Sequence, residues 1–142
     1  MGRYSLMSMS VTSSLLKNAD LLLYSSCIER EYPEVVEKQS MDKTALHVCL
    51  QERHMDPVGF KVATIIYKSH PRSITVLTMN GSPHCVQLHM AVEQAKQLTN
   101  YAGAVKHLVV ERGVLIEVSS EAVKAARHLA MVEELLRLAR RS

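Results

Sequence analysis

The chain has 142 residues, of which 47% are hydrophobic and 22% charged, with a formal net charge of +3 at neutral pH. This length and composition suit one globular domain with its own core, and they argue against a fibrous or disordered protein. The charge is mild and much of it comes from three arginines at the C-terminal end, which disfavours a nucleic-acid partner. No apolar run reaches the length of a membrane span. We therefore predict a soluble cytoplasmic protein with a single domain over residues 1–142, in which residues 1–10 are flexible.

Strand-like and helix-like segments alternate along the chain. Buried-strand patterns, rich in apolar and β-branched residues, predict strands over residues 20–25, 44–50, 73–80, 105–111 and 114–118. Helical periodicity and start signals predict helices over residues 29–39, 56–69 and 84–100, and a last helix that begins near residue 120. Arg112-Gly113, between the last two strands, predicts a tight hairpin.

This alternation predicts an α/β fold. Strands separated by helices favour a mostly parallel sheet covered on both faces, which is a three-layer, Rossmann-like architecture. Right-handed crossovers restrict the arrangement of about five strands, and we predict the order 2-1-3-4-5 with the last strand antiparallel. The last helix has an apolar surface that is broad for packing on one sheet, so we also expect a homo-oligomer, with a dimer favoured.

The three cysteines follow, or end, the first three predicted strands. Cys27 comes after the first strand, Cys49 ends the second, and Cys85 follows the third. The carboxyl ends of parallel strands share one edge of a sheet, and open α/β folds bind ligands there, where the strand order reverses. The predicted topology therefore places all three thiols at the expected ligand-binding edge. An odd, widely spaced set of cysteines also argues against a secreted disulfide framework.

Cys85 has the richest chemical surroundings of the three. With Ser82 as N-cap and Pro83 at the first position, Cys85 lies at the start of a helix, where backbone amides favour a thiolate. His89 lies one turn later on the same helical face, and His84 is adjacent, so a thiol and an imidazole could bind one metal ion. The alternative is that these cysteines are small buried hydrophobic residues and these histidines only structural.

Two segments resemble motifs of known families. Ser82-Pro83-His84-Cys85 after a strand resembles the thioredoxin-type Cys-x-x-Cys motif, with Ser82 in the place of the first cysteine. The layout, with Cys27-Ile28-Glu29-Arg30 and Gly81-Ser82-Pro83-His84-Cys85, also resembles the small β-class carbonic anhydrases. That second resemblance implies zinc bound by Cys27 and Cys85, with Glu29 as the orienting acid. It leaves His84, His89 or Cys49 as the third ligand, because Ser82 stands where the family has a histidine.

Three functional hypotheses follow, and the sequence does not choose among them. The first is a metal site of Cys27, Cys49 and Cys85 with His84 or His89, in which zinc is the simplest ion and a metal-bound water supports hydration or hydrolysis. The second is a thiol redox, sensor or iron–sulfur protein that uses Cys85, or an enzyme in which Cys85 is the nucleophile and a nearby histidine its base, with Glu29 as a further catalytic candidate. The third is a non-catalytic homo-oligomeric module. The substrate is not predicted.

Overall fold

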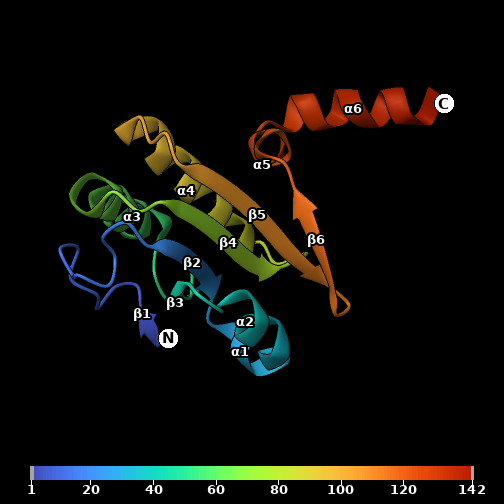
Figure 1. Cartoon of the computed structure of the whole chain (residues 1–142). Helices are drawn as coiled ribbons and strands as arrows, with labels where there is room; N and C mark the ends of the chain where they lie inside the picture. Colours follow the sequence, from blue (N-terminus) through green and yellow to red (C-terminus); the bar gives the residue numbers. More distant parts are fainter. Residues whose placement is uncertain (1, 142) are drawn as a thin grey trace.

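The computed structural model describes residues 2–141 and contains one mixed sheet with helices on both faces (Figure 1). The strands are β1 (Arg3–Ser5), β2 (Asp20–Ser25), β3 (Thr44–Val48), β4 (Ser73–Met79), β5 (Ala104–Glu111) and β6 (Val114–Val118). The helices are α1 (Cys27–Glu31), α2 (Pro33–Gln39), α3 (Met55–Ser69), α4 (Cys85–Thr99), α5 (Ser120–Arg127) and α6 (Leu129–Arg141).

The strand order is β1-β3-β2-β4-β5-β6, and only β5 and β6 pair in antiparallel fashion. The predicted order of the five main strands and their directions are therefore confirmed. β2 lies between β3 and β4, with Leu23 opposite both Leu46 and Val76. The chain moves to one side of β2 for β3 and to the other side for β4, so the order reverses at β2.

The sixth strand, β1, lies where the sequence predicted no regular structure. Arg3 to Ser5 pair in parallel with Ala45 to His47, and the amide of Leu6 donates to the carbonyl of His47 at 2.9 Å. The Leu6 side chain that follows is completely buried. Residues 3–6 are thus held at the sheet edge. A strand of three residues is too short to show the alternation on which sequence reasoning depends.

Helices cover the two faces of the sheet unequally. α3 and α4 pack side by side on one face, and α1 and α2 lie on the other (Figure 1). The segment predicted as one helix over residues 29–39 is two helices, because Tyr32 leaves the helical region before Pro33 starts the second one. The last helix is also divided, at His128, into α5, which packs on α4, and α6.

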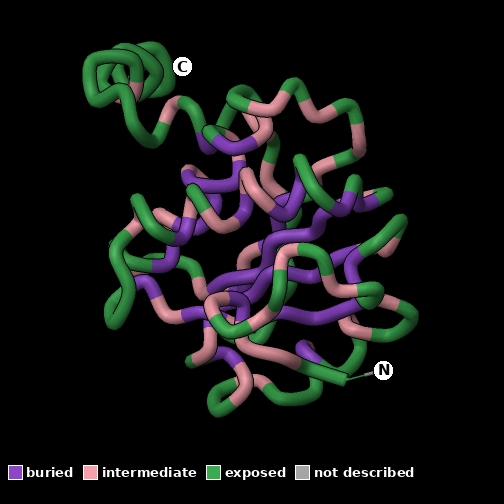
Figure 2. Tube along the Cα trace, turned by 90° about the vertical axis from the view of Figure 1, so that its left-hand side faces the viewer, coloured by how far each residue is buried: buried purple, intermediate pink, exposed green. Residues whose placement is uncertain are grey.

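The core consists of two apolar layers on either side of the sheet. β2 contributes Leu21 and Leu23 to the layer under α3 and α4, and Leu22 and Tyr24 to the opposite layer. This use of successive residues on opposite faces explains the uninterrupted apolar run of β2. Buried segments concentrate in the centre of the molecule, whereas α6 is exposed along its length (Figure 2).

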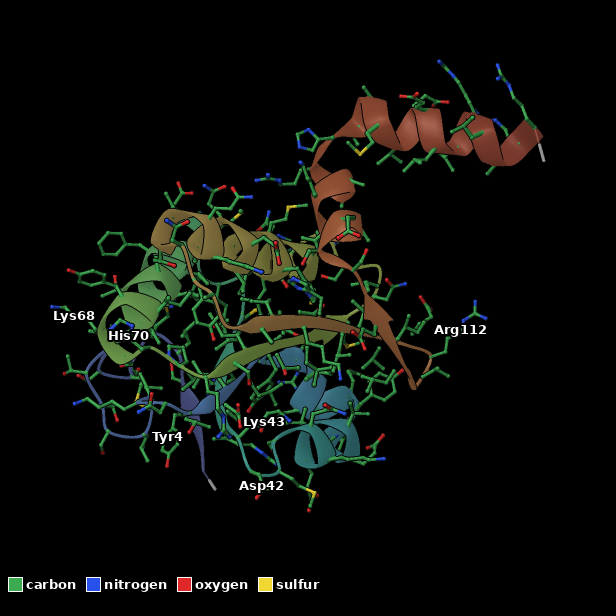
Figure 3. The ribbon with its side chains drawn as sticks, turned by 45° about the horizontal axis from the view of Figure 1, so that its top comes forward. Tyr4, Asp42, Lys43, Lys68, His70 and Arg112 are labelled. Carbon is green, nitrogen blue, oxygen red and sulfur yellow. The ribbon has the colours of Figure 1, made fainter. Side chains whose placement is uncertain are left out.

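The β5–β6 hairpin has the predicted two-residue turn. Glu111 pairs with Val114, and the intervening Arg112 and Gly113 have φ of 50° and 81°. Two left-handed residues match the twist of the flanking strands. The Arg112 side chain extends from the tip of the hairpin (Figure 3).

Asp20, the first residue of β2, gives a testable pH dependence. Hydrogen bonds from Arg72 and Ser73 lower the pKa of Asp20 from 3.8 to about 2. Because the folded state prefers the carboxylate, this contribution is complete above pH 4 and is lost as the pH falls toward about 2. We expect the stability difference between the wild type and Asp20→Asn, measured by urea unfolding, to shrink over that range. A difference that stays constant with pH would show that these bonds do not favour the charged form.

Candidate functional site

The candidate site is the sheet edge at the carboxyl ends of β2, β3 and β4. α1 begins at Cys27, two residues after β2 ends, and Cys49 directly follows β3. Gly81 turns the chain after β4, and α4 then begins at Cys85. Gly81 has a φ of 89°, a conformation that glycine adopts without the steric cost of a side chain.

The three thiols are free and differ in exposure. Cys27 is exposed, Cys49 is half-buried and Cys85 is buried. The Sγ atom of Cys27 is 3.7 Å from Ser25 Oγ. Burial raises the pKa of the Cys27 thiol, and so do the neighbouring thiols of Cys85 and Cys49, whereas the Ser25 hydroxyl lowers it. Cys27 therefore interacts with both other thiols, and it is a thiol rather than a thiolate near neutral pH.

The start of α4 agrees only in part with the prediction: Ser82 bonds the first turn, but the N-cap residue is His84 and not Ser82. The hydroxyl of Ser82 accepts a hydrogen bond from the Cys85 amide at 3.2 Å, and its carbonyl accepts from Val86 at 3.3 Å. The regular helix begins only at Cys85, since Pro83 and His84 form the turn that leads into it. The cap fixes the position of Cys85 beside the end of β4.

The thiols do not have an arrangement that fits a metal ion. Within residues 2–141, no group of three or more His, Cys, Asp or Glu side chains is placed so that it could hold one. His84 is exposed at the start of α4. Both ring nitrogens of His89 are hydrogen-bonded, one to Thr78 and the other to His107. His47 instead lies 3.4 Å from the hydroxyl of Ser26.

Glu29 connects three elements of the fold. Its Oε1 atom accepts a hydrogen bond from the Tyr24 hydroxyl at 2.8 Å and lies 3.2 Å from the Arg3 guanidinium. Burial, followed by the hydrogen bond to Glu29, raises the pKa of Tyr24 above its usual range. The carboxylate of Glu29 thereby ties α1 to β2 and β1.

A second feature of this edge is a chain of hydrogen-bonded side chains beneath α4, which we call the histidine chain. Thr78 Oγ1 lies 2.7 Å from His89 Nε2, and His89 Nδ1 lies 2.8 Å from His107 Nδ1. His107 Nε2 lies 2.7 Å from Glu93 Oε2, which also accepts from the Ser120 hydroxyl at 3.0 Å. Thr78, His89 and His107 are at most 2% exposed.

Each end of the histidine chain opens into a surface pocket. The first, the Gly81 pocket, has a volume of about 330 Å³ and is lined by Thr78, Met79, Asn80, Gly81, Ser82, Pro83, Val86, His89 and Val109. The second, the Glu93 pocket, has a volume of about 140 Å³ and is lined by Met90, Glu93, Gln97, Ser120, Glu121, Val123, Lys124 and Arg127. No cysteine lines either pocket.

The imidazole ring of His89 is uncharged at neutral pH. Burial, and then the neighbouring His107, lower its pKa from 6.5 to about 3. His89 therefore keeps one ring proton at neutral pH, and its two ring nitrogens act as one donor and one acceptor. His107 Nε2 faces the Glu93 carboxylate.

This sheet topology agrees with a comparison of the sequence with protein families. A family model described as a Rossmann-like domain matches residues 13–139. The chain belongs to this Rossmann-like family. No curated protein and no solved structure is significantly similar to it, and the matched family model is not one of carbonic anhydrases. In residues 2–141 of this Rossmann-like domain, no helix has the length and apolar character needed to span a membrane.

Four members of the histidine chain were not predicted as site residues. Of the five, only His89 was a candidate, and it was one for a metal. The sequence did contain a signal, because His89 and Glu93 are spaced i, i+4 on one helix face. His107, in contrast, lies within an otherwise apolar strand, and only the pairing of β4 with β5 brings it beside Thr78 and His89. In this Rossmann-like domain the histidine chain thus depends on tertiary structure.

Proposed function

We propose that this Rossmann-like domain is a thiol redox protein in which Cys27 and Cys85 form a reversible disulfide. The single observation that supports it most is the position of the two cysteines after β2 and β4, two paired strands, where the neighbouring Cys85 thiol raises the pKa of Cys27. The predicted redox motif lacked a partner for Cys85 because Ser82 occupies its usual place, and Cys27 supplies that partner from a different element.

The positions of the two cysteines suit this role. Cys27 follows β2 and Cys85 follows β4. These two strands are hydrogen-bonded neighbours, so their backbones lie about 4.8 Å apart. Cys27 is exposed, so an oxidant in solution reaches it, while Cys85 is buried and would act as the second thiol. A hydroperoxide, by oxidising Cys27 to a sulfenic acid, loses one oxygen atom. Attack by the Cys85 thiolate then forms the S–S bond and releases water.

The proposal is tested by the loss of thiols on mild oxidation. Treatment of the full chain with a stoichiometric amount of hydrogen peroxide should remove two of the three thiols, and dithiothreitol should restore them. Peptide mapping should identify the Cys27–Cys85 link. Because the pKa of Cys27 is raised, disulfide formation should continue to accelerate above neutral pH.

Two cysteine variants provide the matched control. Cys27→Ser should abolish the intramolecular disulfide, whereas Cys49→Ser should leave it intact. A Cys27–Cys49 link, or oxidation that stops at one thiol per chain, would contradict the proposed pair.

The same protein preparation tests the alternative of a zinc site. Zinc would need Cys27, Cys49 and Cys85, with His84 or His89, to approach one another as ligands, and the residues of the described chain do not fit that arrangement. The carbonic-anhydrase-like hydration predicted from zinc and Glu29 depends on the same ligands. Elemental analysis that finds one bound zinc per chain, lost in Cys27→Ser, would favour the metal over the disulfide; an iron–sulfur cluster would be recognised by its iron and its colour.

We propose, in addition, that the domain assembles with a second copy of itself through α6. None of the residues of α6 is buried, and its large apolar side chains share one half of the helix, among them Leu129, Met131, Leu135 and Leu136. The opposite half carries two acids, Glu133 and Glu134, followed by three arginines near the C-terminus. Glu133 is ion-paired with Arg137 and Arg140 of its own helix, so the apolar half of α6 alone would form the contact, and the same apolar half of a second copy is the matching partner surface.

A further inference from the structure

The histidine chain joins two pockets that lie at different positions along α4. Thr78 and His89 line the Gly81 pocket, while Glu93 and Ser120 line the Glu93 pocket. His107 is between them, with 1% of its surface exposed, and each of its two ring nitrogens has a partner within 2.8 Å. A purely structural hydrogen-bond network needs no opening at either end, whereas the histidine chain reaches a pocket at each of its two ends.

We propose that the histidine chain is a proton relay, and that the Gly81 pocket is an acid–base site for a small uncharged ligand that carries a hydroxyl group. This site is independent of the disulfide, because no cysteine lines the pocket.

The pocket lining indicates the class of ligand. Its wall consists mostly of apolar side chains and the turn at Gly81, and its polar side chains are Thr78, Asn80, Ser82 and His89. Asn80 is already hydrogen-bonded to Glu111. None of the described residues that line the pocket has a charged side chain that could pair with an ionic ligand. The volume of the pocket is at the small end of the range for ligand sites. Thr78 offers a hydroxyl that can exchange a proton with a ligand hydroxyl.

The order of donors and acceptors allows a proton to pass without any charge remaining on His89. In the resting arrangement Thr78 donates to His89 Nε2, His89 Nδ1–H donates to His107 Nδ1, and His107 Nε2–H donates to Glu93. When the ligand hydroxyl gives a proton to Thr78 Oγ1, the Thr78 proton moves to His89 Nε2, and the His89 Nδ1 proton moves to His107 Nδ1. The resulting imidazolium gives its Nε2 proton to Glu93. The proton lost by the ligand thus ends on the Glu93 carboxyl group, and the ligand oxygen keeps the negative charge and accepts a hydrogen bond from Thr78.

The surroundings of Glu93 suit a proton exit. Glu93 is held by His107 and by the Ser120 hydroxyl, and the same pocket contains Glu121, Lys124 and Arg127 from α5. The Glu93 carboxylate thus lines a pocket through which a proton can be passed to solvent.

The ligand part of the proposal is tested with phenol, a neutral hydroxyl compound, and with toluene, which has a similar shape and no hydroxyl. With ¹⁵N-labelled histidine in the full chain, phenol should shift the ring nitrogen signals of His89 and also of His107, which does not line the pocket. Toluene should shift neither. Thr78→Val should abolish the effect of phenol on His107, and Thr78→Ser, which keeps the hydroxyl, should retain it.

The relay part is tested by exchange of the buried ring protons with heavy water. Glu93→Gln removes the proton acceptor at the exit, so exchange at His107 should slow by about tenfold or more, the effect expected from one lost hydrogen bond to a charged group. Glu121→Gln, in the same pocket but outside the histidine chain, should leave the rate unchanged. Unchanged exchange in Glu93→Gln would overturn the relay. The proposed ligand class would be overturned by the absence of phenol binding or by equal effects of phenol and toluene.

Discussion

Replacement of Leu23 by alanine should lower the free energy of unfolding by about 3 kcal/mol, within the range of 2–5 kcal/mol usual for such core truncations. Leu23 is in the central strand β2, opposite Leu46 on one side and Val76 on the other, and it is 1% exposed. Rigid strands on both sides prevent collapse around the shortened side chain, so a cavity adds to the lost burial. Urea unfolding at neutral pH measures the change.

Leu98→Ala is the matched control for this substitution. Leu98 is a leucine of α4 that the structure leaves 71% exposed. We expect the control to change the unfolding free energy by at most about 0.5 kcal/mol. Equal losses in the two variants would mean that Leu98 is buried in solution, for example by a partner, and a small loss in Leu23→Ala would contradict the packing of β2.

Much of the fold was predictable because its signals are local. Buried strands such as β2 are uninterrupted apolar runs. Asp and Pro residues and Ser82 mark the starts of helices, and Arg112-Gly113 marks a turn. The strand order followed from the handedness of crossovers. β1 was missed since it is too short to have a pattern, and its stability comes from pairing with β3. The break at His128 was missed because the helical periodicity continues through it.

The candidate site, like the fold, could be predicted from the sequence only in part. The approach of Cys27, Cys49 and Cys85 was predicted from topology, and the thiols of Cys85 and Cys49 are among the groups that raise the pKa of Cys27. Their exact spacing depends on loop conformations that no periodicity encodes, so the choice between metal and disulfide was beyond the sequence. His89 was expected to face the thiols, but its ring nitrogens are hydrogen-bonded to Thr78 of β4 and His107 of β5. A buried imidazole is fixed by its hydrogen-bond partners, and these come from distant parts of the chain.

The largest change that we expect in any solution property follows from removing the apolar face of α6. The wild type should sediment as a dimer, and Leu135→Glu with Leu136→Glu should sediment as a monomer. Leu135 and Leu136 are 53% and 49% exposed in the single chain, so the charges cost little there. In a dimer they would be desolvated without a partner, which is costly. Unfolding of the monomeric variant should show an intact core, because α6 contributes no buried residue to it.

A glutamate on the opposite half of α6 separates loss of the interface from a general effect of charge. Ala130 is exposed and lies among the charged residues of the helix, so Ala130→Glu introduces the same side chain away from the apolar face. We expect this variant to remain dimeric. Glu133 pairs with Arg137 and Arg140 of its own helix, on the half of α6 that carries the charges. High salt should therefore leave the wild-type dimer intact, because salt does not screen an apolar contact. A wild type that sediments as a monomer at high concentration would refute the assembly while leaving the disulfide and the relay untouched.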